Sequence, residues 1–463
     1  MGIKLDWEIE TEKSGAHTAT EDPVVLRSRR QAQVRFLITF AVILLVLGGI
    51  GALLSWRLSE ADARIEQFLR DTVEAEVAAL RIGDWNAFYS AQRSADPSWG
   101  EQTQRALFDE YQSLKTSGDL QLTGTIRNLE IDGTRGRALV EEIIDGAPYV
   151  ETWFYWRYED GWRHVPPDYT FWGEPQQYNG TRVTVKYAAL DDVVAREIGL
   201  NIEGWVEGTC TAILECGDFP HITVNILTDD SLTTPRWSVD NHWVLEVPSP
   251  FLKRVRYDQP FGGQLKVDTA DAVARRLVEQ SSANLTPATY PSDAYYLRPA
   301  VVSWLVGRFV ALNTNSYLIT SLAANYGNTA VGKLVRTLKP DSSATVLAEV
   351  AGVIQLNEAN LDWRDFLTWR LALENQLASR SDQTAFLALY DLNAAGIAQQ
   401  RYDTFNPNSL PPDGVVTQVQ AGTGSDGVPQ LDATVDYNDT SGTLINQAHI
   451  LFKLIDNVWK RAN

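Results

Sequence analysis

The chain has few of the residues that carry metal or redox chemistry. It contains five histidines and two cysteines: His17, His164, His221, His242, His449, Cys210 and Cys216. No two histidines are spaced as HxxxH, and no His/Cys cluster offers the about four ligands that zinc takes. No Walker A loop and no G-x-S-x-G elbow occurs. We therefore predict no metal centre, no cofactor and no catalytic residue.

Cationic residues are also scarce. Lys and Arg number 40 against 59 Asp and Glu, which gives a net charge of -19. Binding to phosphate backbones requires clustered Lys and Arg, so the sequence excludes a nucleic-acid partner. The same charge disfavours a chain that lies flat on anionic lipid.

One long apolar run is present at residues 36–56, FLITFAVILLVLGGIGALLSW. It has no charge and the length of about 20 residues that a helix needs to cross a bilayer. Arg27, Arg29, Arg30 and Arg35 precede it, which predicts a cytoplasmic N-terminus. The alternative is a signal peptide cleaved near Ala61, but the apolar run is long for that. We expect a cytoplasmic tail at 1–35, a transmembrane helix at 36–56 and an extracytoplasmic remainder, anchored in the cell membrane by one spanning helix.

The two cysteines lie on the predicted exterior, where disulfides persist. A bridge between Cys210 and Cys216 would close a short loop just before the apolar segment 221–226. A disulfide is the preferred interpretation, with free thiols as the alternative.

Residues 57–175 read as helices followed by strands. Ile65, Phe68, Leu69, Val73 and Val77 recur at helical spacing, and the period then changes to two from Leu120 onward. This order predicts an α+β fold. Together with the segment YVETWFYWRYEDGWRHVPPD, it resembles the NTF2-like cone fold.

The end of the chain repeats features of this segment. Helix residues from Glu76 match those from Glu374, 298 residues later, and Trp162 matches Trp459, 297 residues later. Such a nearly constant separation predicts one module used twice, so residues 373–463 would be a second NTF2-like domain. Coincidence between two helix-then-sheet segments is the alternative.

Residues 176–372 resemble the peptidase MA-like family of gluzincin metallopeptidases. The resemblance rests on FWGEPQQY before the first strand, VPSP after the sheet, Asp271-Ala272-Val273-Ala274 opening a helix, Trp304-Leu305, and Tyr326-Gly327. It also suggests a bacterial origin.

The family's HExxH helix binds zinc through two histidines, with the Glu as base, and a downstream Glu completes the ligand set. The aligned former metal-site positions are Arg275, Arg276, Glu279 and Gly307. Two cations at these positions would repel zinc. The resemblance therefore implies a pseudopeptidase without enzymatic activity.

Other candidate sites are weak. Gly422 to Gly427 fits GxGxxG but lies in a polar loop without a following helix. The aromatic residues around Trp153 either pack a core or line a cone. His164 and Asp168 are candidates for a base and its orienting group, although a surface histidine in a Pro-Pro turn is the preferred reading. Gly48 and Ala52 permit close helix pairing.

These observations predict a non-catalytic, membrane-anchored binding or scaffold protein. An extended polypeptide or protein is the expected partner, with Arg275 and Arg276 meeting its carboxylates. The alternatives are a small-molecule binder or enzyme built on an NTF2-like cone, and a transmembrane signalling regulator.

Overall fold

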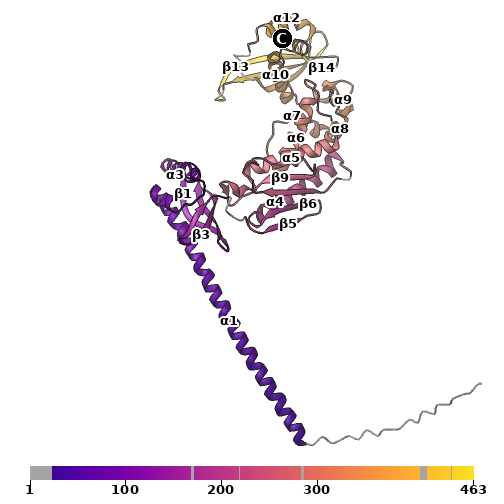
Figure 1. Cartoon of the computed structure of the whole chain (residues 1–463). Helices are drawn as coiled ribbons and strands as arrows, with labels where there is room; N and C mark the ends of the chain where they lie inside the picture. Colours follow the sequence, from indigo (N-terminus) through magenta and orange to yellow (C-terminus); the bar gives the residue numbers. More distant parts are fainter. Residues whose placement is uncertain (1–22, 168–171, 218, 283–285, 407–413, 440) are drawn as a thin grey trace, which may run out of the picture.

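The computed structural model describes residues 23–167, 172–217, 219–282, 286–406, 414–439 and 441–463 (Figure 1). The fold is mixed α+β with one long apolar helix near the N-terminus, as the sequence predicts in outline. The polar tail predicted before residue 23 and the candidate residue Asp168 lie outside the described residues.

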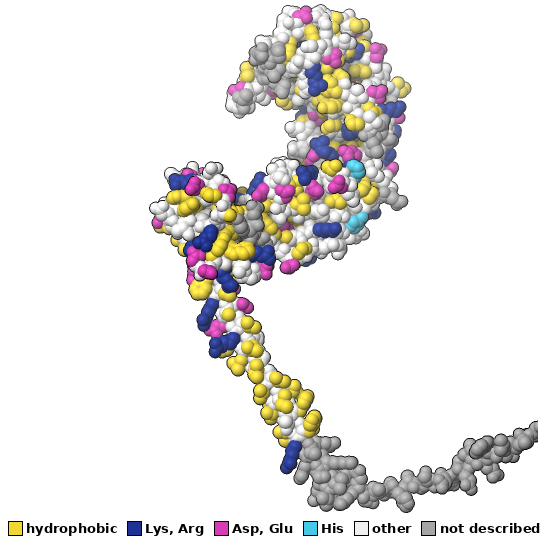
Figure 2. Space-filling model, in the orientation of Figure 1, with side chains coloured by type: hydrophobic (Ala, Val, Ile, Leu, Met, Phe, Trp, Pro, Cys, Tyr) yellow, Lys and Arg dark blue, Asp and Glu magenta, His cyan; other side chains and the backbone are white. Residues whose placement is uncertain are grey.

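Helix α1 (Pro23–Ile82) is continuous over 60 residues, which corresponds to a length of about 90 Å. It begins before Phe36, so the last part of the predicted irregular tail, residues 23–35, is helical instead. The helix from Val34 is long and apolar enough to cross a membrane by length and composition. Its apolar side chains are exposed along the projecting shaft in Figure 2.

The same helix enters a folded module, which we call the first module (residues 57–175). Leu69, Val73, Val77 and Leu80 are buried at the end of α1 and lie in a core with Trp153 and Tyr155. The membrane candidate and the module core are thus parts of one rigid element. The other elements of the module are α2 (Trp85–Ser90), the π-helix η1 (Trp99–Gln104), α3 (Arg105–Ser117), β1 (Leu120–Asp132), β2 (Arg135–Ile144), β3 (Ala147–Tyr158) and β4 (Gly161–Val165).

These four strands form an antiparallel sheet in which β1, β2 and β3 are neighbours and β4 pairs with β3. Gly118, with φ 85°, ends α3 in the left-handed conformation, which glycine adopts without a Cβ clash. Gly133, with φ 62°, forms the turn between β1 and β2. Turn residues of this kind were visible in the sequence.

The middle domain (residues 176–372) has a sheet of order β5-β6-β7-β9-β8. Strands β6, β7 and β9 are parallel, and the two edge strands are antiparallel to their neighbours. Its strands and short 3-10 and π segments are β5 (Pro175–Asn179), β6 (Val183–Ala188), η3 (Ala189–Asp191), η4 (Cys210–Leu214), β7 (Ile222–Leu227), β8 (Arg236–Trp237), β9 (Val244–Pro248), η5 (Pro250–Leu252), β10 (Val255–Arg256) and η6 (Leu356–Ala359). Its helices are α4 (Asp192–Thr209), α5 (Gly263–Ser281), α6 (Ala294–Val310), α7 (Tyr317–Tyr326), α8 (Asn328–Thr337) and α9 (Val346–Ala351).

The second module (residues 373–463) again places helices before an antiparallel sheet. Helix α10 begins at Arg364, so the predicted start at residue 373 falls inside a helix. The sheet order is β11-β12-β13-β14. Its elements are α10 (Arg364–Ser379), α11 (Gln383–Ala388), η7 (Leu392–Ala394), α12 (Ala395–Asp403), β11 (Gly414–Thr423), β12 (Pro429–Asn438), β13 (Leu444–Ile455) and β14 (Val458–Arg461).

Together the three parts form a crescent, with the two modules at its ends and the middle domain between them (Figure 1). The first module joins the middle domain through β10, which pairs with β3. The second module joins it through a continuous apolar core that includes Trp363 and Trp459. Leu139 and Val150 of the first module belong to this same core, so both junctions contain apolar packing.

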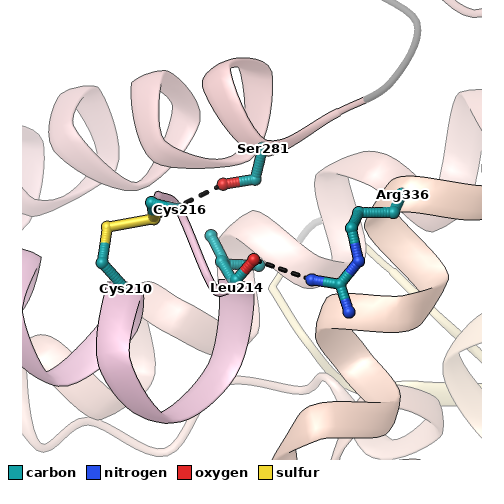
Figure 3. The surroundings of a disulfide bond; sticks show 5 residues. All are labelled: Cys210, Leu214, Cys216, Ser281 and Arg336. Carbon is teal, nitrogen blue, oxygen red and sulfur yellow. Dashed lines mark hydrogen bonds between the residues drawn. A yellow bond between two sulfur atoms is a disulfide. The ribbon is translucent and has the colours of Figure 1, made fainter. Parts of the chain in front are cut away.

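Cys210 and Cys216 form a disulfide in the turn that follows α4 (Figure 3). The Ser281 hydroxyl donates to Cys216 Sγ at 3.5 Å, and Arg336 Nη1 donates to the Leu214 carbonyl at 2.7 Å. Helix α8 can approach this turn because residue 332 is glycine, where an added Cβ would lie 1.9 Å from the Ile213 carbonyl oxygen. The bridge thus holds a turn against which two helices pack.

Candidate binding groove and buried carboxylates

Three of the four positions that the resemblance aligns with metal-site residues, Arg275, Arg276 and Glu279, lie on helix α5. Arg275 is 56% exposed and its Nε lies 2.6 Å from Asp271 Oδ2, an i,i+4 pair. Arg276 is 18% exposed and its Nη1 lies 3.2 Å from Glu279 Oε2. The two cations are therefore already neutralised by acids of the same helix.

The Arg276 guanidinium lies beside two tryptophan rings that also contact each other. It is 4.8 Å from the ring centroid of Trp237 and 6.0 Å from that of Trp243. Trp237 Nε1 donates to the Ala272 carbonyl at 3.0 Å, which fixes its ring against α5. A cation over an aromatic face gains about 0.5–2 kcal/mol, more when it is shielded from water. Arg276 is thereby held in one position.

Two adjoining cavities share Arg276 and Glu279. The smaller, about 360 Å³, continues over residues 234–237 of the β8 segment and over Asp268, Asp271 and Arg275. The larger, about 790 Å³, is lined further by His242, Trp243, Gln280, Pro287, Ala288, Tyr295, Arg298 and Pro299. We call this continuous depression the α5 groove.

The fourth position, Gly307, belongs elsewhere. Of the described residues that line the two cavities, none is Gly307. A Cβ at this position would meet the Leu312 carbonyl oxygen at 2.9 Å and Thr314 Oγ1 at 2.8 Å. The structure thus brings Arg275, Arg276 and Glu279 together, and Gly307 serves the close turn at the end of α6.

No cluster of three or more His, Cys, Asp or Glu side chains suited to a metal ion occurs among the described residues. The side chains of the α5 groove are instead arginines, acids and aromatic rings. This set suits the binding of carboxylates and extended backbone rather than the coordination of a cation.

The prediction that His164 is a surface residue is wrong. It is 5% exposed, and its Nδ1 lies 2.6 Å from Oε1 of the buried Glu76. Tyr155 donates to the other Glu76 oxygen at 2.8 Å, and Gln92 Nε2 donates to Oε1 at 2.8 Å. Burial beside Glu76 raises the pKa of Tyr155 well above its ordinary value. Sequence reasoning missed this pair because its members are 88 residues apart.

The aromatic strand of the first module packs a core. Trp153, Tyr155 and Trp162 are 1%, 0% and 3% exposed and contact the apolar face of α1. The rings of Trp153 and Tyr155 lie 5.5 and 5.2 Å from that of His164. These rings therefore fill the space around His164, while a cavity of about 740 Å³ lies between Ile65, Phe68 and Glu76 of α1 and residues 157–163.

The second module has a matching buried carboxylate, Glu374. It accepts from Tyr390 at 2.9 Å and from Arg461 Nη1 at 2.8 Å, and Arg401 Nη2 lies 3.4 Å away. Glu374 and Arg401 line a cavity of about 370 Å³ with Leu371, Asn375, Gly414, Tyr437, Ile445 and Asn446. The buried carboxylate of the second module therefore borders a cavity.

A pair of neighbouring carboxyl groups, the buried Glu142 and the half-buried Glu151, lies at the junction of the first module and the middle domain. Arg254 Nε lies 2.8 Å from Glu142 Oε2, and Tyr111 contacts both carboxyl groups. Burial, its largest cause, raises the pKa of Glu142 to about 8, and the neighbouring Glu151 adds to this while Arg254 opposes it. Burial likewise raises the pKa of Glu151.

Comparison with known proteins found no similar protein. No family model matches the chain, no curated protein matches it, and no solved structure matches it. The function must be inferred from the residues and geometry described above.

Proposed function

We propose that this chain is a non-catalytic, membrane-anchored binding or scaffold protein whose α5 groove binds an extended polypeptide outside the cell membrane. In this proposal the apolar part of α1 spans the membrane, with the N-terminus in the cytoplasm. The arginines before residue 36 support this orientation, because cytoplasmic flanks carry the Lys/Arg excess.

The observation that carries the proposal is the α5 groove beside an edge strand. β8 is the last strand of its sheet, so one side of its backbone has no strand partner among the described residues. An extended peptide can add to such an edge through main-chain hydrogen bonds, with side-chain pockets supplying specificity. Trp237 of β8 and the adjoining cavities would supply these pockets.

The arginines define the chemistry of the peptide. Arg275 is held by an exposed i,i+4 pair, which contributes only about 0.3–0.5 kcal/mol. A peptide carboxylate can therefore replace Asp271 at small cost and form a bidentate contact with the guanidinium. We infer that the peptide carries Asp or Glu side chains.

The proposed architecture is a degenerate peptidase MA-like domain between two NTF2-like modules. A parallel bridge between Gln92 and His164 in the first module has a counterpart between Tyr390 and Arg461 in the second. Asp84 and Asp382 each cap a short helix by accepting from the backbone three residues on. These paired features support a duplicated module.

The test uses the full chain in nanodiscs and a set of labelled acidic peptides with their amide counterparts, in which Gln and Asn replace Glu and Asp. Fluorescence anisotropy should detect binding of an acidic peptide, and Arg275→Glu/Arg276→Glu should weaken it at least about tenfold, since each lost ion pair becomes a repulsion. The matched control is Arg196→Glu, which removes another exposed i,i+4 pair, on α4. Unchanged binding in the double variant would contradict the proposal.

A second candidate function rests on the cavity of the second module. Arg401, 42% exposed, and the buried Glu374 line it together with the amides of Asn375 and Asn446. Cavities with a few convergent polar groups are typical of small-molecule sites. This candidate predicts a small anionic or amide-bearing ligand bound at Arg401.

A further inference from the structure

The pair Glu142 and Glu151 lies where the first module meets the middle domain. Glu142 is on β2 and Glu151 on the neighbouring strand β3, and the register places them diagonally on one face of the sheet. The Glu142 side chain is fully buried, and Tyr111 of α3 is 2% exposed. The two carboxyl groups are thus held on one face of the sheet, with Glu142 buried and Glu151 half-buried.

The contacts of Tyr111 favour a proton shared by this pair. The Tyr111 hydroxyl contacts Glu142 Oε1 and lies 2.9 Å from Glu151 Oε2. A phenol donates one proton, whereas an ionised carboxylate only accepts, so a single donor faces two acceptors unless one carboxyl group is protonated. Like charges in one buried site also favour a shared proton.

The cation that completes the cluster belongs to the middle domain. Arg254 immediately precedes β10, whose Val255 pairs with Val150 of β3. The backbone of Tyr257 then donates to the Pro148 carbonyl at 3.0 Å. The contact between Arg254 and Glu142 therefore reinforces the short strand pairing that joins the two parts.

Other charged groups reach the cluster from each packed element. Glu110 of α3, 52% exposed, lies 3.0 Å from Arg254 Nη1. The ring of His164 on β4 lies 5.5 Å from that of Trp153, two residues along β3 from Glu151. With one proton on the pair, Arg254 faces one carboxylate of the pair and the exposed Glu110. Without that proton, both carboxylates of the pair share this cation with Glu110.

We propose that the Glu142–Glu151–Arg254 cluster is a proton-dependent hinge, closed while the carboxyl pair holds a proton and loosened when the proton is lost. The membrane-fixed first module then changes its angle to the middle domain and to everything beyond it. The proposal does not depend on what the α5 groove binds.

The direction with pH follows from the raised pKa of Glu142, about 8 in the folded chain against 4.5 ordinarily. Its stabilising effect on the junction is complete below pH 4.5, decreases as pH rises, and is lost above about pH 8. Acidic solution should close the hinge and alkaline solution should open it.

The test measures a distance across the junction in the full chain in nanodiscs. Spin labels at Ser117→Cys on α3 and Leu200→Cys on α4 report the separation, and both positions are exposed. Pulsed electron paramagnetic resonance should give one narrow distribution at pH 6 and a shifted or broader one at pH 9, with a midpoint near pH 8. The existing cysteines are joined to each other and do not take the label.

Two variants test whether the carboxyl pair causes the change of distance with pH. Glu142→Gln mimics the protonated carboxyl group, so its distribution should stay at the pH 6 form even at pH 9. The matched control is Glu110→Gln, an exposed partner of the same arginine, which should keep the wild-type response. If Glu142→Gln does not fold, Glu151→Gln tests the same shared proton. The hinge is refuted if the wild-type distance is constant from pH 6 to 9, or if the Gln variant shifts as the wild type does.

Discussion

The first and second modules have the same arrangement of a buried glutamate, with a different partner residue in each. In each, a buried glutamate on a helix accepts from a tyrosine and faces a side chain of the final strand. The pairs are Glu76 with His164 and Glu374 with Arg461, and their sequence separations are 88 and 87 residues. A titratable partner in one copy is thus matched by a permanent cation in the other.

The junctions of the two modules differ in their charged groups. Glu142 and Arg254 meet where the first module joins the middle domain, beside the apolar residues Leu139 and Val150. The sheet of the second module shares the same apolar core with the middle domain, and residues of each module line a cavity. Asn457 Oδ1 accepts from the Leu356 backbone at 2.8 Å and adds a direct link. The first module thus adds buried charges to its apolar junction, and the second adds a hydrogen bond between a side chain and the backbone.

The largest expected effect comes from neutralising the two buried glutamates. Glu374→Gln leaves Arg461, 5% exposed, without its carboxylate, so the second module should lose about 3–5 kcal/mol. Glu76→Gln should cost about 1–3 kcal/mol, because a neutral imidazole can still bond an amide. Hydrogen–deuterium exchange of the full chain, read on peptides of each module, separates the two effects.

Equal loss of protection in the two variants would show that the two pairs are energetically alike. The matched control is Asp432→Asn, which alters the exposed pair between Asp432 and His449 in the second module. It should leave exchange unchanged.

A smaller effect is expected from opening the disulfide, which lies in neither module. Cys210→Ser/Cys216→Ser should destabilise the turn after α4 by about 2 kcal/mol, since the bridge closes a short loop. Exchange should increase in η4 and α8 but remain unchanged in both modules. Spread of the effect into the second module would show that the apolar core transmits it.

The sequence predicted elements whose signals are local. The apolar run at 36–56, the helix that contains Asp271-Ala272-Val273-Ala274 and the apolar segment 221–226 all lie in elements of the structure. The helix was predicted to open at Asp271 but begins eight residues earlier, at Gly263.

The buried polar pairs could not be predicted in the same way. Glu142 and Arg254 lie far apart in the chain, and nothing adjacent to either residue indicates the other. The sequence placed Arg275, Arg276 and Glu279 on one helix. The tryptophans beside Arg276 come from other parts of the chain, Trp237 from β8 and Trp243 from the turn before β9, so local patterns could not indicate them. Gly307 was assigned to the same site by alignment alone, and its packing places it in a helix-ending turn.

The smallest effect concerns the third group at each glutamate. Arg401 is 42% exposed and lies 3.4 Å from Glu374, so Arg401→Ala should cost less than about 1 kcal/mol in stability. If the cavity of the second module binds a small anion, the same variant should nevertheless abolish the thermal shift produced by a panel of small carboxylates. Gln92→Ala, which removes the third group at Glu76, is the matched control and should leave that shift intact. If the panel stabilises neither the wild type nor the variant, the cavity at Arg401 does not bind small carboxylates. The α5 groove would then be the one proposed binding site that remains for this chain.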